Sequence, residues 1–149
     1  MTYEIKPATE KDRQWVVGTA AKRMVEEEIG RSDLYVPAQI AMFFHRVVKD
    51  ETGLICWKDG KRVGMVGGIL LPHHLRPSYV VLTEIVWYVD PDYRQTRAAT
   101  LLMNGYKKLI DEKADEGIFS LLAHTPVDDS SMERMGVKPY ERNYIYRKQ

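Results

Sequence analysis

The strand, turn and helix predicted over residues 79–113 constrain the fold more than any other part of the chain. Residues 79–89, YVVLTEIVWYV, are rich in β-branched and aromatic side chains, which favours a long strand. The sequence Asp90-Pro91-Asp92 then ends the strand, because proline has no N–H to donate to a sheet. Over residues 96–113, apolar residues recur at helical spacing along one face. This order predicts a domain in which helices pack on a sheet.

The rest of the sequence completes an α+β domain with the order β-α-α-β-β-β-α-β-α-β. Strand composition or alternation predicts strands at residues 3–7, 54–57, 62–71, 118–123 and 137–147. Helical spacing and helix-ending glycines predict helices at residues 11–29, 37–48 and 128–135. Asp59-Gly60 is a strong hairpin signal, and residues 72–77 are predicted to be a loop. Residues 1–149 are expected to form a single domain, because this length suits one hydrophobic core.

Charge, hydropathy and cysteine content exclude several classes of protein. The net charge of +1 gives no bulk attraction to nucleic acid and disfavours it as a partner. Cys56 is the only cysteine, so the sequence predicts neither a disulfide framework nor a thiolate metal cluster. No apolar run is long enough to span a membrane, and the charged start MTYEIKPATEKDR is unlike a secretion signal. We therefore expect a cytoplasmic protein.

The start of the helix near Thr96 is a candidate phosphate-binding site. A helix start carries unpaired backbone N–H groups and a partial positive charge, both of which favour an anion. Arg94 and Arg97 add donors and charge, and the small residues Ala98 and Ala99 allow close approach. The alternative from local features alone is a plain strand–turn–helix joint with exposed arginines.

These residues resemble the GNAT N-acetyltransferase family. Its pyrophosphate loop reads Gln or Arg, any two residues, Gly, any residue, then Gly or Ala; here it falls on residues 94–99, RQTRAA. The order of predicted elements and the late helix ending in Met135-Gly136-Val137 are also similar to the family. The resemblance implies a central mixed, mostly antiparallel sheet, acetyl-coenzyme A as cosubstrate without a metal, an amine acceptor, and a possible homodimer. It further implies that the cofactor is held by Val89, Arg94, Gln95, Thr96, Arg97, Ala98, Ala99 and Thr100.

The resemblance also implies catalytic residues. The backbone N–H of Val89 would stabilise negative charge on the acetyl oxygen. Glu84 is a carboxylate within an apolar strand and is similar in placement to the general base of some family members. A structural ion pair, or a solvent-facing side chain, is the alternative for Glu84. Strict alternation along the strand predicts that Glu84 shares a face with Leu82, Val86 and Tyr88, and that Val89 lies on the opposite face.

Three positions depart from the family pattern, and one of them is Thr125, which stands where the family often has an asparagine before the late helix. Arg97 replaces the first glycine of the loop, and we predict that it tolerates this place because it already belongs to the first helical turn. Met132 stands where the family usually has a tyrosine that protonates the departing thiolate. Ser131, water, or one of Tyr140, Tyr144 and Tyr146 could supply that proton, although packing in the final strand is the first expectation for the tyrosines. A catalytically inactive domain that binds coenzyme A or a protein partner is the competing interpretation.

Overall fold

The computed structural model describes residues 2–122, 124–125 and 127–149 and has one open sheet of five strands in the order β1-β2-β3-β4-β5. β1 to β4 are antiparallel, and β5 lies parallel to β4. The strands are β1 (Tyr3–Pro7), β2 (Gly53–Lys58), β3 (Lys61–His73), β4 (Arg76–Val89) and β5 (Glu116–Ile118). The predicted mixed, mostly antiparallel sheet is confirmed. The predicted loop at 72–77 is wrong in extent, because β3 and β4 continue to a tight turn after His73.

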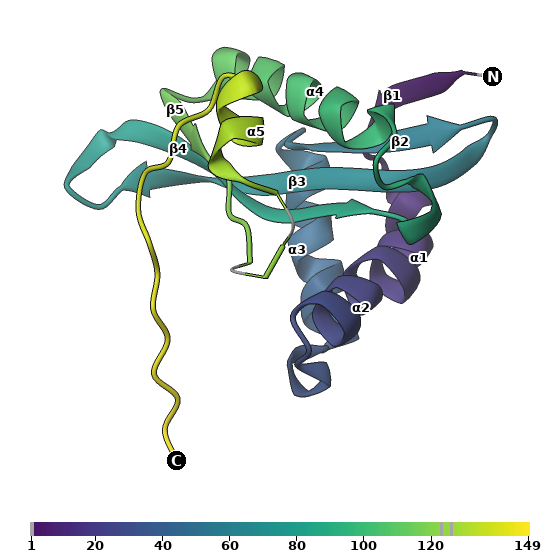
Figure 1. Ribbon diagram of the computed structural model, residues 1–149, viewed down its shortest axis with the longest axis horizontal. Helices are drawn as coiled ribbons and strands as arrows, with labels where there is room; N and C mark the ends of the chain where they lie inside the picture. Colours follow the sequence, from purple (N-terminus) through teal and green to yellow (C-terminus); the bar gives the residue numbers. More distant parts are fainter. Residues whose placement is uncertain (1, 123, 126) are drawn as a thin grey trace.

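Helices cover both faces of this sheet (Figure 1). One face is covered by the first helical stretch and by α3 (Pro37–Lys49). The first stretch consists of α1 (Arg13–Trp15) and α2 (Ala21–Arg23), each followed by a π-helical turn, at Val16–Ala20 and Met24–Glu28. The other face is covered by α4 (Arg97–Lys113). A short helix, α5 (Asp129–Arg134), lies beside α4.

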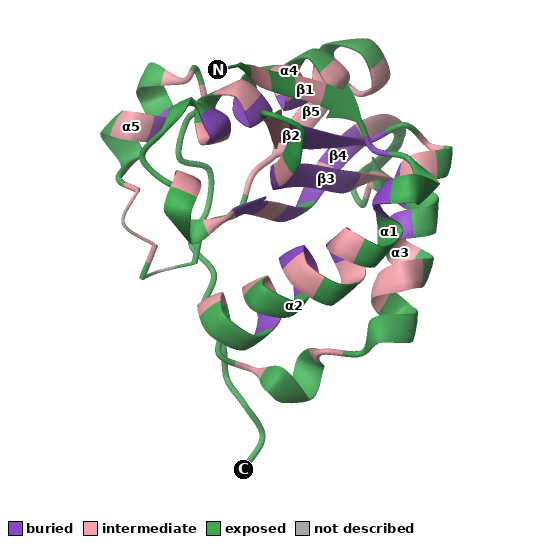
Figure 2. Cartoon of the chain, turned by 90° about the vertical axis from the view of Figure 1, so that its right-hand side faces the viewer, coloured by how far each residue is buried: buried purple, intermediate pink, exposed green. Residues whose placement is uncertain are grey.

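The core lies in two layers, one on each side of the sheet. Figure 2 shows the buried residues concentrated in β2, β3 and β4, between α4 on one side and α1 to α3 on the other. On the α4 side, Leu102 and Tyr106 pack on Leu54 and Leu82. On the opposite side, Phe44 packs with Ile55 and Met65. In the described residues, no helix is long and apolar enough to cross a membrane.

The last two predicted strands differ from the structure. β5 ends at Ile118, so residues 119–122 of the predicted strand 118–123 are irregular, and Ala123 lies outside the described residues. Residues 137–147 form no strand, although they are rich in strand-favouring side chains. A strand requires a neighbour that accepts and donates its backbone hydrogen bonds, and this segment runs away from the sheet (Figure 1).

Candidate active site

β4 extends well beyond its parallel neighbour β5. The two strands pair only at Val81↔Glu116, Leu82↔Gly117 and Thr83↔Ile118. In the described part of the chain, no strand pairs with the outer edge of β4 beyond Thr83. The N–H of Asp90, the residue after β4, donates to Val63 O in β3 at 2.8 Å. In an antiparallel pair, the N–H groups of successive residues point alternately toward the partner strand and away from it. The backbone N–H groups of Val89 and Trp87 therefore point away from β3, toward this open edge.

A β-bulge in β4 changes which side chains share a face. Gly67 pairs with Val86 and Gly68 pairs with Glu84, so Ile85 is an extra residue, and 43% of it is exposed. Before the bulge, Leu82 packs on the α4 side. After it, Trp87 and Val89 pack on the α4 side, whereas Val86 and Tyr88 pack on the α3 side. The prediction that Glu84 shares a face with Val86 and Tyr88, opposite Val89, is wrong because strict alternation ends at the bulge.

Glu84 is buried on the α4 side of the sheet, with only 7% of the residue exposed. Burial raises the pKa of its carboxyl to about 7, and a hydrogen bond from the backbone N–H of Ser120 opposes that rise. The pKa of the nearby Tyr106 hydroxyl is also raised, first by burial and then by the charge of Glu84. A carboxyl with a pKa near 7 exchanges its proton readily at neutral pH, as a general base requires.

Two further polar atoms are buried on the α4 side of the sheet. Tyr106 Oη and Trp87 Nε1 lack a hydrogen-bond partner within the residues that the structure describes. Both rings contact Phe119, with ring centroids 5.4 and 6.5 Å from it. Sequence reasoning missed this cluster, because a tyrosine in α4 and a tryptophan in β4 are typical core residues.

The start of α4 forms an open pocket of about 420 Å³, lined by Gln95, Thr96, Arg97, Thr100, Leu101 and Asn104. Thr96 is the N-cap: its hydroxyl accepts from Ala98 N at 3.3 Å and donates to Tyr93 O at 2.5 Å. At such a helix start, the N–H groups of Arg97 and Ala99 have no intrahelical acceptor. The pocket is therefore lined by donors, as an anion requires.

In the turn between β4 and α4, the residue with a strained, left-handed backbone comes before the first residue of the helix. Arg97 is the first residue of α4, which confirms the prediction of helical backbone angles there. The left-handed conformation falls on Gln95 instead, with φ of 65°. Ala98 does not line the pocket, because its methyl is buried against the core and its N–H donates to the Thr96 hydroxyl.

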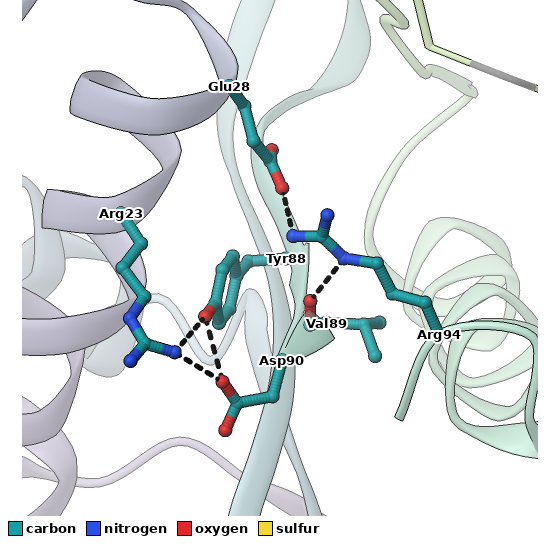
Figure 3. A network of polar contacts seen from close by, with 6 residues as sticks. All are labelled: Arg23, Glu28, Tyr88, Val89, Asp90 and Arg94. Atoms are coloured by element: carbon teal, nitrogen blue, oxygen red, sulfur yellow. Dashed lines mark hydrogen bonds and ion pairs between the residues drawn. The ribbon is translucent and has the colours of Figure 1, made fainter. Parts of the chain in front are cut away.

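Arg94 does not line this pocket; its guanidinium contacts the end of β4 and the first helical stretch instead (Figure 3). Its Nε donates to Val89 O at 2.8 Å, and its guanidinium pairs with Glu28. Burial raises the pKa of Glu28, and the charge of Arg94 opposes this. Arg94 thus links the end of β4 to the first helical stretch. Sequence analysis missed Glu28, because a run of three glutamates usually forms a solvated helix face.

A second polar network fixes the end of β4 from the same side (Figure 3). Arg23 in α2 pairs with Asp90 at 2.7 Å. Tyr88 Oη donates to Asp90 at 3.1 Å and accepts from Arg23 at 3.4 Å. Burial raises the pKa of the Tyr88 hydroxyl, which keeps it a hydrogen-bond donor.

Ser131 lies apart from these networks. Its N–H donates to Asp128 at the start of α5, and its hydroxyl accepts from Arg134 at 3.0 Å. Met132 is buried beside it. The prediction that Tyr140, Tyr144 and Tyr146 pack in a final strand is wrong, because all three are exposed.

The histidines of the β3–β4 turn do not form a metal site in the described residues. His73 and His74 stack on each other with ring centroids 4.8 Å apart. Within residues 2–122, 124–125 and 127–149, no three His, Cys, Asp or Glu side chains are placed to hold a metal ion.

The fold and site can now be compared with known proteins. A possible acetyltransferase from Clostridium difficile 630 superposes with a TM-score of 0.74 at 16% identity, covering 100% of this chain and 99% of that one. AAC(6')-Iy, solved with the bisubstrate analogue CoA-S-monomethyl-acetylneamine, gives a TM-score of 0.76 at 14% identity, with 100% and 99% covered. Glucosamine-6-phosphate N-acetyltransferase from Arabidopsis thaliana gives 0.72 at 10% identity, with 99% of each chain covered. These likenesses show the fold.

Sequence comparison gives the family. No curated protein matches the chain. The sequence model of the acetyltransferase (GNAT) family matches residues 16–135, which include α2, α3, the sheet from β2 to β5, α4 and α5. The chain therefore belongs to the GNAT acetyltransferase family.

Proposed function

We propose that this chain is a cytoplasmic, single-domain N-acetyltransferase that moves an acetyl group from acetyl-coenzyme A to a primary amine by direct attack. One observation carries the proposal. Glu84, a buried carboxyl with a pKa raised to about 7, lies on the strand whose outer edge opens just beyond it. The strand thus combines a candidate base with free backbone donors.

The open edge of β4 and the start of α4 suit the two halves of coenzyme A. The amide-bearing arm of the cofactor would lie extended along β4 and pair with backbone groups of Trp87 and Val89. Its pyrophosphate would lie at the start of α4, against residues 95–100, with Arg97 adding charge. Arg94 would join this site by leaving Glu28, an exchange of one anionic partner for another.

The acceptor amine must lose a proton before it can attack. An alkyl ammonium has a pKa of about 10.4, so almost none of it is neutral at pH 7. In the proposed reaction, the Glu84 carboxylate takes one proton, directly or through water. The amine nitrogen then forms a bond to the acetyl carbon as the carbon–sulfur bond breaks. Negative charge that develops on the acetyl oxygen would be met by the N–H of Val89.

The departing thiolate takes the last proton. Because a thiol has a pKa of about 8.5, the cost of leaving unprotonated at pH 7 is only about 2 kcal/mol. Met132 offers no proton, so Ser131 or water would supply it and would regain a proton from the nitrogen, which must lose a second proton as it becomes an amide. The hydroxyl of Ser131 accepts from Arg134 and donates to the Asp128 carboxylate, so Ser131 would have to release Asp128 before it could donate its proton to the thiolate.

Labelled acetyl-coenzyme A and a pooled amine panel test the proposal. Two of the similar structures are an aminoglycoside N-acetyltransferase and a glucosamine-6-phosphate N-acetyltransferase. The panel therefore begins with amino sugars and adds polyamines, lysine peptides and free peptide N-termini. Transfer of label that is lost in Glu84→Gln supports the enzyme. Binding of coenzyme A without transfer to any acceptor supports the alternative, an inactive domain that binds the cofactor or a protein partner.

A further inference from the structure

The Arg94 guanidinium occupies the open edge of β4 at the place where the cofactor arm is proposed to pair (Figure 3). The N–H of Asp90 points toward β3, where it donates to Val63 O at 2.8 Å. In a planar trans peptide the carbonyl points opposite to the N–H, so Val89 O points toward the open edge. Arg94 Nε donates to this oxygen at 2.8 Å. Arg94 therefore makes the contact that an amide N–H of the cofactor would make.

The same guanidinium binds Glu28 on the helical side of this edge. Arg94 Nη2 donates to the Glu28 carboxylate, at the end of the π-helical turn Met24–Glu28. Such wide turns often occur at functional sites. Because one guanidinium joins the two oxygens, the carboxylate lies within about 8 Å of Val89 O. A short alkyl chain spans that distance, so a molecule that reacts beside Val89 can also contact Glu28.

Glu28 is buried enough to need a positive partner. Only 28% of its side chain is exposed. Burial raises the pKa of its carboxyl; the charge of Arg94 opposes this rise, the charge of Glu27 adds to it, and the charge of His124 opposes it. A half-buried carboxylate that loses its positive partner is poorly solvated, which is costly. When Arg94 moves to the pyrophosphate, another cation is therefore favoured at Glu28.

We propose that Glu28 selects the acceptor: after Arg94 has moved to the pyrophosphate, the Glu28 carboxylate binds a second cationic group of the acceptor. The inference rests on the proposed function, because cofactor binding is what draws Arg94 away. The amine that attacks must be neutral, so a separate ammonium or guanidinium group is required at Glu28. Acceptors with two positive charges are therefore favoured over acceptors with one.

The movement of Arg94 also couples the two ligands. While Arg94 pairs with Glu28, the chain's own cation fills the place of the second charge, and a dication gains nothing there. Once the cofactor has taken Arg94, the carboxylate accepts the dication. Because coupling between two binding sites is reciprocal, the dication should in turn strengthen the binding of the cofactor.

Titration of coenzyme A in a calorimeter tests the exchange of Arg94 without an acceptor. Glu28→Gln should bind coenzyme A about two- to fivefold more tightly than the wild type, because Arg94 no longer leaves an anionic partner and partly exposed ion pairs have that strength. In an Arg94→Gln background, the same substitution should have no effect. Glu26→Gln, at an exposed carboxyl of the same turn, is the matched control and should not change the affinity. An equal or weaker affinity in Glu28→Gln would overturn the exchange.

Short amines test the selection on the chain saturated with coenzyme A, where no acetyl group is available to transfer. Propanediamine, putrescine and cadaverine are each compared with the monoamine of the same carbon number. At least one diamine should bind the loaded wild type about tenfold more tightly than its monoamine, and about tenfold more tightly than it binds the chain without coenzyme A. Glu28→Gln should lose both preferences, whereas Glu26→Gln should keep them. Equal binding of every diamine and its monoamine, or preferences that survive Glu28→Gln, would contradict the selection.

These measurements separate the role of Glu28 from the proposed function. A wild-type chain that binds no coenzyme A refutes both. Binding of coenzyme A without a preference for any diamine refutes only the role of Glu28. A diamine preference that depends on Glu28, together with no transfer of label to any acceptor, supports the role of Glu28 and refutes the proposed transfer.

Discussion

Replacing Glu84 by glutamine tests both the burial and the proposed role of this carboxyl. The pKa of Glu84 is raised from 4.5 to about 7, mainly by burial. Below pH 4.5 the group is protonated in both the folded and the unfolded chain, so folding carries no charge penalty. As the pH rises toward 7, the unfolded chain ionises while the folded chain stays protonated, and the wild type loses stability. Above pH 7 both states are ionised and the penalty is constant.

The size of this effect follows from the shift in pKa. Each pKa unit is worth about 1.4 kcal/mol, so the full penalty is about 3 kcal/mol, of which about 2–3 kcal/mol develops between pH 5 and pH 8. Glutamine has no titrating proton, and its carbonyl oxygen can still accept the N–H of Ser120. The Glu84→Gln chain should therefore gain stability relative to the wild type by this amount as the pH rises.

Urea unfolding followed by circular dichroism at pH 5, 6, 7 and 8 measures the difference directly. In thermal melts, the same difference should appear as about 2–4 °C for each kcal/mol. Glu112→Gln is the matched control, because it makes the same change at an exposed carboxyl of α4, outside the core. If Glu84→Gln behaves like this control, Glu84 is solvated and the argument from burial fails. In activity assays, Glu84→Gln should lower kcat by about 10²–10⁴-fold at pH 7, with a smaller loss at high pH, where the amine deprotonates unaided.

Three further substitutions have expected outcomes. Arg97→Ala should weaken coenzyme A binding by about 1–3 kcal/mol in calorimetry, whereas Arg76→Ala, at the distant β3–β4 turn, should not change it. Gly68→Ala should destabilise the fold by about 1–3 kcal/mol or more in a urea titration, because the new Cβ would clash with Tyr106 Oη. Gly18→Ala is the control and should be neutral or stabilising, because its new Cβ would have no atom within 4 Å. Tyr106→Phe should leave the free energy of unfolding unchanged or raise it by about 1–2 kcal/mol, since it removes a buried hydroxyl without a partner in the described residues. A decrease in the free energy of unfolding by more than about 1–2 kcal/mol would instead reveal a hydrogen bond to this hydroxyl.

Local sequence patterns predicted the parts of the candidate site whose conformation depends on residues adjacent in the sequence. The capped start of α4 at Thr96 and the helical backbone of Arg97 follow from the turn and helix sequence alone. The bulge at Ile85 could not be predicted in this way, because it arises where β3 and β4 pair and nothing in the alternation of β4 marks it. The pairing of Arg94 with Glu28 joins segments far apart in the sequence, and local patterns carry no information on it.

The left-handed residue of the turn explains how the proposed phosphate site tolerates an arginine in place of the glycine of the family pattern. A glycine in the loop is needed only where φ is positive or where a side chain would obstruct the ligand. Here the positive φ occurs at Gln95, two residues before Arg97, and the side chain of Gln95 is exposed. Thr96 then caps the helix, so Arg97 enters with ordinary helical angles. The backbone strain therefore falls on Gln95, whose side chain is exposed to solvent. Arg97, in the first helical turn, adds charge to the pocket without a conformational penalty.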